Sequence, residues 1–433
     1  MRALSDNIHC NPMQASTVSL AFCAVLLASL VVKFWLASRQ MRHVHQHRQA
    51  VPAPFDRTIP LEAHQRAADY TIVRTRYGLL TEAFGTAVLL GWTLLGGLDL
   101  LNALLRDAIE PRWGAMAYQL ALFGAFSLIG GLLDLPFEWY RVFHIEQRFG
   151  FNRMTPGLFV ADLFKGALVG VVIGAPLLAG VLWVMGATGG WWWLWAWALW
   201  TGFILLMQVI YPTVIAPIFN KFKPLDDATL TGRVQALMQR CGFQAKGFFV
   251  MDGSRRSAHG NAYFAGMGRS KRVVFFDTLL ARLQPAEVEA VLAHELGHFH
   301  HRHVLHRMLM ILALALAGLG LLGWLANQSG FYAGLGVMPN LGVPNHALAL
   351  LLFMMATPPV MFFIAPLIAR TSRKAEFEAD AYACAQADGR ELSSALLKLY
   401  EDNAATLTPD PLYVRFYYSH PPASERLAAL SRG

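Results

Sequence analysis

The sequence predicts a mainly α-helical membrane protein with several spanning helices and one modest polar region. Of its 433 residues, 55% are hydrophobic and only 15% are charged. Soluble domains have about 45–50% apolar and about 25% charged residues. Apolar stretches cover most of the chain, and the longest polar stretches after residue 100 are 217–307 and 370–433. This composition excludes collagen-like, disordered and disulfide-rich secreted chains and argues against a soluble enzyme.

Seven apolar stretches are candidates for membrane helices. A spanning helix needs about 20 mostly apolar residues. The first stretch could be mistaken for a signal peptide, but Lys33 lies near its end and residues 38–41 are a poor small-residue cleavage site, so we expect a retained anchor. The seven stretches are roughly 16–36, 79–103, 115–136, 157–184, 191–216, 308–326 and 347–369.

The arginines predict the orientation of these spans. The loop 37–78 carries seven arginines and the loop 137–156 carries three, whereas 185–190 and 327–346 contain no Lys or Arg. Cytoplasmic loops of membrane proteins carry the excess of basic residues. We therefore expect an N-terminus outside and a C-terminus in the cytoplasm. This bias also accounts for the net charge of +8, so we expect no nucleic-acid partner.

The order of spans and polar segments divides the chain into four parts. Residues 1–216 hold helices one to five with their loops, and 308–370 hold helices six and seven. Residues 217–307 and 371–433 are each short for a separate domain, and we expect them to build one domain together. Because two spans form a hairpin between these parts, the end of the first part returns next to the start of the second.

A zinc-protease motif occupies the end of the first part. Residues 294–298 read His-Glu-Leu-Gly-His, in a segment whose Pro285 and early acids are typical of a helix start. His294 and His298 lie four residues apart on one helix face, where both imidazoles can bind one Zn²⁺. Glu295 lies beside the metal without binding it and can take a proton from the attacking water. The alternatives are a chance match or a solvated histidine tract.

A third ligand is expected just past span seven. A catalytic zinc usually has three protein ligands, and Glu376 lies where the hairpin predicts a partner. Asp380 is one helical turn further and could accept the N–H of a ligand histidine. Glu378 points to another face of the helix. The alternative is that Glu376 pairs with Arg373 on a solvated helix.

Six stretches together resemble the Ste24-type CAAX prenyl proteases (type 1), which are seven-span zinc metalloendopeptidases of the M48 class. The motif His-Glu-x-x-His alone is shared by many families, whereas this ordered set is specific. The stretches are Phe143–Thr155, Tyr211–Leu225, His259–Gly266, His294–His298, Arg373–Asp380 and Ser419–Arg426.

The resemblance implies roles for individual residues. His294, His298 and Glu376 would hold one zinc ion, with Glu295 as general base and later acid. Asp380 would orient a ligand histidine. Asn261, ahead of an expected strand at 272–276, would bind the substrate backbone. His420 would stabilise the oxyanion, and Arg426 would support the substrate or His420. For His420 and Arg426, the alternative is a surface loop that caps a C-terminal helix.

The resemblance also implies the architecture: seven helices that enclose a water-filled chamber, with a zincin-like catalytic domain and a small β element at the cytoplasmic end. Charged residues inside the spans agree with a chamber, because they would be costly facing lipid. Residues near span ends could instead extend to the headgroups. These charged residues are Glu82, Asp99, Asp134, Asp162 and Lys165.

The resemblance predicts a zinc-dependent membrane endopeptidase that removes the C-terminal tripeptide of prenylated proteins. Its partners are a peptide or protein substrate, possibly prenylated, and the lipid bilayer, with no obligate protein partner. One alternative is a quality-control protease for non-prenylated substrates. Another is a transporter or receptor with a structural zinc. An intramembrane protease is disfavoured because residues 299–307 after the motif are too polar for a bilayer core. His300, His301, His303 and His306 in this stretch are expected to form a solvated or headgroup-level face.

Overall fold

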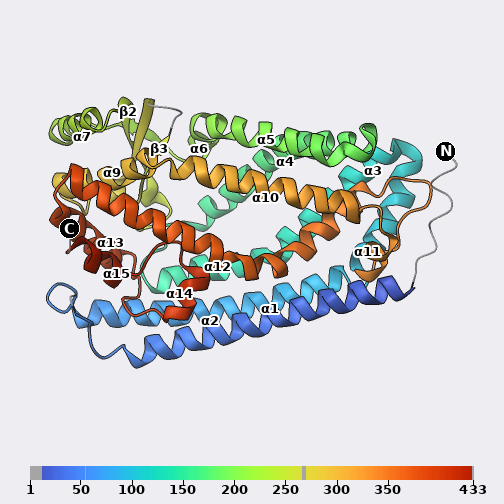
Figure 1. Ribbon diagram of the computed structural model, residues 1–433, viewed down its shortest axis with the longest axis horizontal. Helices are drawn as coiled ribbons and strands as arrows, with labels where there is room; N and C mark the ends of the chain where they lie inside the picture. Colours follow the sequence, from blue (N-terminus) through green and yellow to red (C-terminus); the bar gives the residue numbers. More distant parts are fainter. Residues whose placement is uncertain (1–11, 54, 266–269, 432–433) are drawn as a thin grey trace.

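Seven long helices run side by side along the molecule, and the remaining elements gather at one end (Figure 1). The computed structural model describes residues 12–53, 55–265 and 270–431. Within these residues, six helices are long and apolar enough to cross a membrane, and α2 is long but is not among them. The seven are α1 (Pro12–Gln46), α2 (Leu61–Trp92), α3 (Gly97–Tyr140), α4 (Pro156–Ala187), α5 (Trp192–Ile210), α10 (His303–Leu325) and α12 (His346–Gln386).

The predicted second span, 79–103, is divided in the structure. Helix α2 ends at Trp92, and a turn at 93–96 precedes α3. Gly96 adopts a φ of 78°, a left-handed conformation that glycine tolerates at no steric cost. The predicted loop 104–114 is helical up to a break at Gly114. Hydropathy misplaced these boundaries because the apolar residues continue through the turn.

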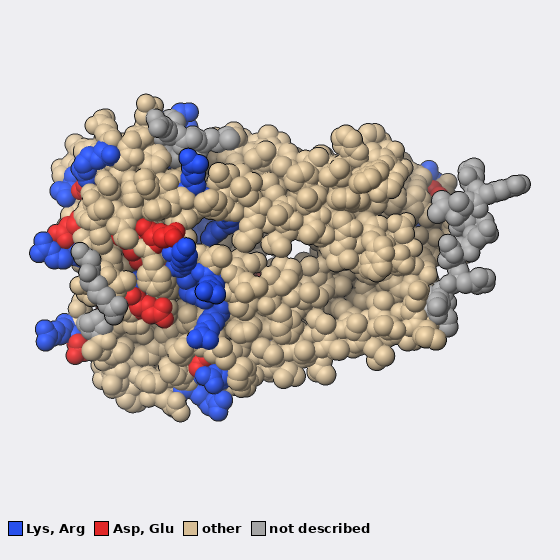
Figure 2. All heavy atoms as spheres, viewed as in Figure 1, with Lys and Arg blue, Asp and Glu red and all other residues tan. Residues whose placement is uncertain are grey.

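The charged residues inside the spans have polar contacts or lie beside a cavity. Lys33 Nζ lies 2.5 Å from Glu82 Oε1. Asp99 Oδ1 accepts a hydrogen bond from the backbone N–H of Met338 at 2.9 Å. Asp162 pairs with Arg256, and Lys165 donates to the backbone oxygen of Ile218. Asp134 lines a cavity. Figure 2 shows a broad band on one face of the long helices that is nearly free of Lys, Arg, Asp and Glu.

A small sheet forms the centre of the polar end. Within the described residues its strand order is β1-β2-β4-β3, with β2 parallel and β3 antiparallel to β4. Strand β3 therefore lies at an edge of the sheet. The strands are β1 (Phe222–Pro224), β2 (Gln244–Met251), β3 (Ala262–Ala265) and β4 (Ser270–Phe276).

Both polar segments contribute to one hydrophobic core around this sheet. The core includes Val234, Phe275 and Leu296 from the first segment and Ala383 and Leu396 from the second. The surrounding helices are α6 (Ala216–Phe219), α7 (Ala228–Arg240), α8 (Asp277–Leu280), α9 (Pro285–His300), α13 (Gly389–Asp402), α14 (Pro411–Tyr417) and α15 (Ala423–Leu430). One short helix, α11 (Ser329–Gly334), packs on α1 at the opposite end of the molecule (Figure 1). Two π-helical segments, Arg141–Glu146 and Tyr211–Ile215, follow α3 and α5.

Helices α9 and α12 cross closely at Gly297, inside the His-Glu-x-x-His motif. A Cβ atom at Gly297 would lie 2.9 Å from Ala379 Cα and 3.1 Å from Tyr382 Cβ. The first of these contacts is with backbone, which cannot move aside like a flexible side chain. The absence of a side chain at Gly297 thus allows α12 to approach the two motif histidines.

We expect Gly297→Ala to destabilise the protein. Overpacking of a tight core typically costs about 1–3 kcal/mol, and the displacement of α12 should also lower the amount of bound metal. The control is Gly232→Ala in α7, where the added methyl group meets nothing within 4 Å. This control should be neutral or slightly stabilising, because alanine is the better helix former. Thermal unfolding in detergent, with metal content measured on each variant, checks the prediction, and equal unfolding temperatures would contradict it.

Candidate active site

Helix α9 presents the two motif histidines from a well-defined start. Gln284 and Glu287 form a capping box at its N-terminus, in which the Gln284 backbone N–H donates to Glu287 Oε2 at 2.7 Å. Pro285 occupies the first helical position, where no backbone N–H is required. One turn apart on this helix, His294 is buried and His298 is partly buried.

Three side chains converge on one point between α9 and α12. His294 Nε2 lies 3.5 Å from Glu376 Oε2, and His298 Nε2 lies 3.4 Å from Glu376 Oε1. One ligand atom from each of the three residues lies within 4.8 Å of the others. Ligand atoms bound tetrahedrally at about 2.0–2.1 Å from a metal lie about 3.3–3.4 Å apart, so the three donors need to move little to hold one ion.

The surroundings of Glu376 also fit a metal. Its Oε2 atom is buried and has no hydrogen-bond partner among the described residues. A buried carboxylate oxygen without a partner is costly, and a cation would satisfy it. The alternative pairing with Arg373 is absent, because Arg373 Nη1 donates instead to the backbone oxygens of Val414 and Tyr418.

Asp380 fixes the orientation of His294. The Nδ1 atom of His294 lies 2.8 Å from Asp380 Oδ1, so the imidazole N–H donates to the carboxylate and Nε2 faces Glu376. Arg426 donates to both oxygens of Asp380, from Nε at 2.8 Å and from Nη2 at 2.5 Å. Because all three side chains are buried, the chain Arg426–Asp380–His294 holds the imidazole rigidly.

A second chain orients His298. Its Nδ1 lies 3.0 Å from His303 Nδ1, and His303 Nε2 lies 2.9 Å from Glu378 Oε2. With the proton on His298 Nδ1, His303 accepts at Nδ1 and donates from Nε2 to Glu378. The expectation of a solvated face is therefore wrong for His303, whose side chain is 14% exposed. Glu378 contacts His303 and Lys374 and lies outside the donor group.

The ionisation of the site follows from burial and these contacts. Burial raises the pKa of Glu295, which favours its use as a proton acceptor. Burial opposes the charge of Glu376 as well, but the nearby imidazoles of His294 and His298 outweigh it and hold the pKa of Glu376 well below its usual range. For His294, burial alone would lower the pKa, but the hydrogen bond to Asp380 and the nearby carboxylate of Glu376 raise it to about 9.

Comparison with known proteins identifies the family. Residues 40–221 match the family model for the CAAX prenyl protease N-terminal region with five membrane helices, and residues 224–433 match the model for peptidase family M48. The "CAAX prenyl protease 1" of Saccharomyces cerevisiae is 30% identical, over 93% of each chain. The "CAAX prenyl protease 1 homolog" of Arabidopsis thaliana is 34% identical, over 75% of this chain and 77% of the relative.

The chain belongs to the CAAX prenyl protease 1 family. A crystal structure of Ste24p from S. mikatae has the same fold, with a TM-score of 0.89 and 28% identity over 95% of this chain and 98% of that chain. This member of the CAAX prenyl protease 1 family is thus a multi-pass membrane metallopeptidase of the M48 class, and it acts on a peptide or protein substrate.

Two further predicted residues of this family member lie at the surface of the site. His420 Nε2 is 3.3 Å from Glu376 Oε1, and its side chain is 61% exposed. Asn261 is exposed directly before the edge strand β3, and its Oδ1 accepts a hydrogen bond from the backbone N–H of Ala262. Both can therefore be reached by a substrate.

Arg426 is placed differently from the substrate contact that the sequence suggested. It is 6% exposed, and its guanidinium donates to Asp380 from behind the histidine. The sequence also suggested support for His420, but the hydrogen bonds and ion pairs of Arg426 within the described residues are with Asp380, Glu376 and His294. We therefore assign Arg426 to the orientation of Asp380.

We expect His303→Ala to weaken metal binding by about 10-fold to 100-fold, the usual effect of removing a residue that orients a ligand histidine. The matched control is His306→Ala, because His306 is an exposed histidine of the same helix α10. Competition with a fluorescent zinc chelator measures the affinities. Equal affinities for the two variants would show that His298 needs no support from His303.

Proposed function

We propose that the chain is a zinc-dependent endopeptidase that removes the C-terminal tripeptide of prenylated proteins. The observation that carries this proposal is the convergence of His294, His298 and Glu376 beside Glu295, which lies next to a ligand in sequence and outside the donor group. Two imidazoles and a carboxylate are a typical donor set of catalytic zinc. The names of the relatives support the CAAX substrate.

In the proposed mechanism, His294, His298 and Glu376 would hold a zinc ion, which would supply Lewis-acid chemistry for the scissile carbonyl and for the attacking water. Glu295 accepts the proton of the attacking water, and its raised pKa makes this transfer favourable. Glu295 then passes the proton to the leaving amine. His420, with its imidazole over the carboxylate of Glu376, donates a hydrogen bond to the developing oxyanion.

The substrate is proposed to bind as an added strand. Strand β3 has a neighbour only on its β4 side among the described residues, so its other edge offers backbone hydrogen bonds to an extended peptide. Asn261 lies at the start of this edge and would bind the substrate backbone. The cleaved bond would then lie between β3 and the donor group on α9.

We also propose that the catalytic domain, 217–307 and 371–433, faces the cytoplasm and that the N-terminus lies outside. The distribution of arginines in the loops supports this orientation. The concentration of charged side chains at the end of the molecule that holds the sheet supports a position of this domain outside the bilayer (Figure 2). The first eleven residues lie outside the described residues. We further predict that the protein works without nucleic acid or an obligate protein partner.

Peptide cleavage by the purified protein in detergent tests the function. The substrates are a farnesylated CAAX peptide and its unprenylated twin, and bound metal is measured by mass spectrometry. We expect release of the tripeptide, with loss of activity in a chelator and recovery with Zn²⁺. Faster cleavage of the prenylated peptide supports CAAX processing. Equal cleavage of the two favours a quality-control protease, and cleavage of neither would overturn the substrate assignment.

A further inference from the structure

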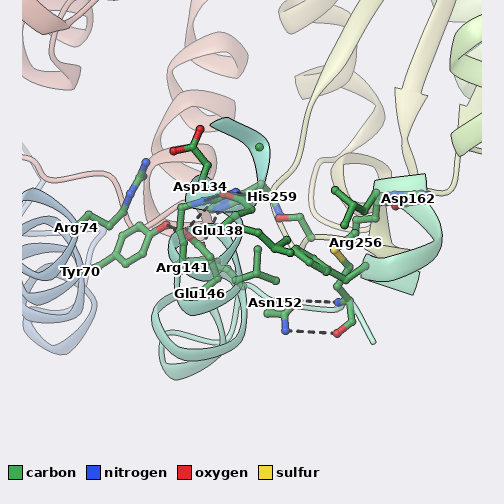
Figure 3. Close-up of a pocket in the computed structure, with 18 residues that line it drawn as sticks. Tyr70, Arg74, Asp134, Glu138, Arg141, Glu146, Asn152, Asp162, Arg256 and His259 are labelled. Atoms are coloured by element: carbon green, nitrogen blue, oxygen red, sulfur yellow. Dashed lines mark hydrogen bonds and ion pairs between the residues drawn. The ribbon is translucent and has the colours of Figure 1, made fainter. Parts of the chain in front are cut away.

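A cavity of about 720 Å³ lies between the membrane helices and the segment that leads into β3. Arg74 of α2, Asp134 of α3 and His259 line it. Figure 3 shows Tyr70 and Arg74 on one side of this cavity and Asp162 and Arg256 on the other, with His259 between them. Its volume lies within the range of about 300–1,000 Å³ found for ligand pockets.

The segment 256–259 is held firmly against the membrane helices. Arg256 donates to both carboxylate oxygens of Asp162, at 2.8 and 3.0 Å. The ring of His259 stacks on Phe151 with centroids 4.5 Å apart, and its Nδ1 lies 2.8 Å from Asn403 Oδ1. Two residues after His259, Asn261 precedes the edge strand. The last cavity residue, His259, therefore lies two positions along the chain before Asn261 and the proposed substrate strand.

The direction of β3 decides which end of a bound peptide meets the cavity. Strand β3 runs from Ala262 to Ala265, away from His259. A peptide that adds antiparallel to β3, the slightly more stable pairing, runs towards His259, so its residues after the cleaved bond enter the cavity. Three extended residues span about 10 Å, which is the separation that the inference requires between the cleaved bond and the cation of the cavity.

The charges of the cavity leave one cation available for a carboxylate. Arg141 forms an ion pair with Glu138, and Arg256 forms one with Asp162. The guanidinium of Arg74 lies over the ring of Tyr70, 5.2 Å from its centroid. Among the salt bridges of the described residues, within 4 Å, Arg74 takes part in none.

Glu146 is the competing anion of the cavity, because the positive charge of Arg74 already stabilises its carboxylate. The hydroxyl of Tyr70 donates one hydrogen bond that the two carboxylate oxygens of Glu146 share, at 3.0 and 2.9 Å. Asp134 also lines the cavity and can accept a backbone N–H of the peptide. If a peptide ran parallel to β3, Asp134 would instead meet its amino end, which is the competing arrangement.

We propose that this cavity binds the carboxyl-terminal residues of the substrate and that Arg74 binds the free terminal carboxylate. The inference rests on the proposed function and deepens it, because it explains how an enzyme with an open edge strand selects the end of a chain. A guanidinium and a carboxylate form two parallel charge-assisted hydrogen bonds. The distance from the cleaved bond to Arg74 would then fix the length of the released peptide.

The test compares a farnesylated CAAX peptide with its C-terminal amide, on the wild type, Arg74→Gln and Arg76→Gln. Arg76 is an exposed arginine of the same helix that does not line this cavity. In the wild type and in Arg76→Gln, we expect amidation to lower kcat/KM by about 10-fold to 100-fold, the effect of losing a hydrogen bond to a charged group. In Arg74→Gln, kcat/KM for the peptide with a free carboxylate should be lower by the same factor of about 10-fold to 100-fold. Amidation of the peptide should then lower kcat/KM no further.

Three outcomes would overturn the inference. Amidation could leave kcat/KM of the wild type unchanged, or it could lower kcat/KM of Arg74→Gln as much as that of the wild type. In the third outcome, kcat/KM depends on the amino end of the peptide, and Asp134→Asn abolishes this dependence. Failure of the proposed function is separate, because the wild type would then cleave neither peptide. Calorimetric titration with the tripeptide Val-Ile-Met and its amide gives an independent measure. If the tripeptide acid binds, and if its binding is weaker after amidation and in Arg74→Gln, the cavity assignment is supported even without cleavage.

Discussion

Glu295→Gln is expected to retain the metal and to lose peptide cleavage by about 10²-fold to 10⁴-fold, the usual contribution of a general base. The glutamine side chain has the same shape as glutamate, but its amide cannot accept the proton. Because Glu295 is outside the group of donors that converge between α9 and α12, the substitution leaves the metal ligands in place. Steady-state cleavage of the farnesylated peptide and metal analysis of the same samples check the two parts of this prediction.

The matched control is Glu289→Gln on the same helix. Glu289 pairs with Arg233 and Arg240, away from the donor group. The substitution Glu289→Gln should therefore leave the rate of cleavage unchanged. Loss of metal from Glu295→Gln would give this residue a role in binding the ion. Full activity in Glu295→Gln would remove the general base and would bring back a transporter or receptor with a structural metal.

Arg426→Ala should produce the largest loss of stability. The side chains of Arg426 and Asp380 are only 7% and 3% exposed. Removal of one partner of a buried pair leaves the other charge without compensation and typically costs about 3–5 kcal/mol. Asp380 would also lose its fixed position against His294, so metal affinity should fall as well. Thermal unfolding in detergent with and without added Zn²⁺ measures both effects.

Arg390→Ala provides the comparison for this prediction. Arg390 pairs with Asp388 at the exposed start of α13, with 92% of its side chain exposed, and its removal should leave the unfolding temperature unchanged. An unfolding temperature for Arg426→Ala equal to that of Arg390→Ala would mean that Asp380 tolerates burial without its partner. Addition of Asp380→Asn to Arg426→Ala should recover part of the lost stability, because the uncompensated charge is then removed.

The sequence predicted the parts of the site that depend on helical spacing. Residues four apart share a helix face, which relates His294 to His298 and Glu376 to Asp380. The hairpin of spans six and seven then explained how the two pairs meet. The expected strand at 272–276 lies within β4, whereas the edge strand β3 that directly follows Asn261 was not predicted.

The rest depended on tertiary contacts that no local pattern encodes. His303 contacts His298 because the chain turns at His301 and Arg302 between α9 and α10, with Arg302 at a φ of 57°. Arg426 reaches Asp380 from α15, 46 residues away. The cavity at His259 combines residues of α2, α3, α4 and the segment before β3. The break at 93–96 escaped detection because hydropathy does not distinguish an apolar turn from an apolar helix.

Helix α12 crosses from the apolar band into the catalytic end without interruption, and both Glu376 and Asp380 lie on its final turns. The two motif histidines lie on α9, which packs on the sheet and α13 as well as on the last turns of α12. A helix whose apolar length exceeds the bilayer thickness tilts to compensate, and a tilt of α12 would move its carboxylates relative to the histidines. The acyl-chain length of the surrounding lipid should therefore regulate peptide cleavage, with an optimum in vesicles of one thickness and lower rates in thinner and thicker ones. A flat dependence would mean that other helices absorb the mismatch.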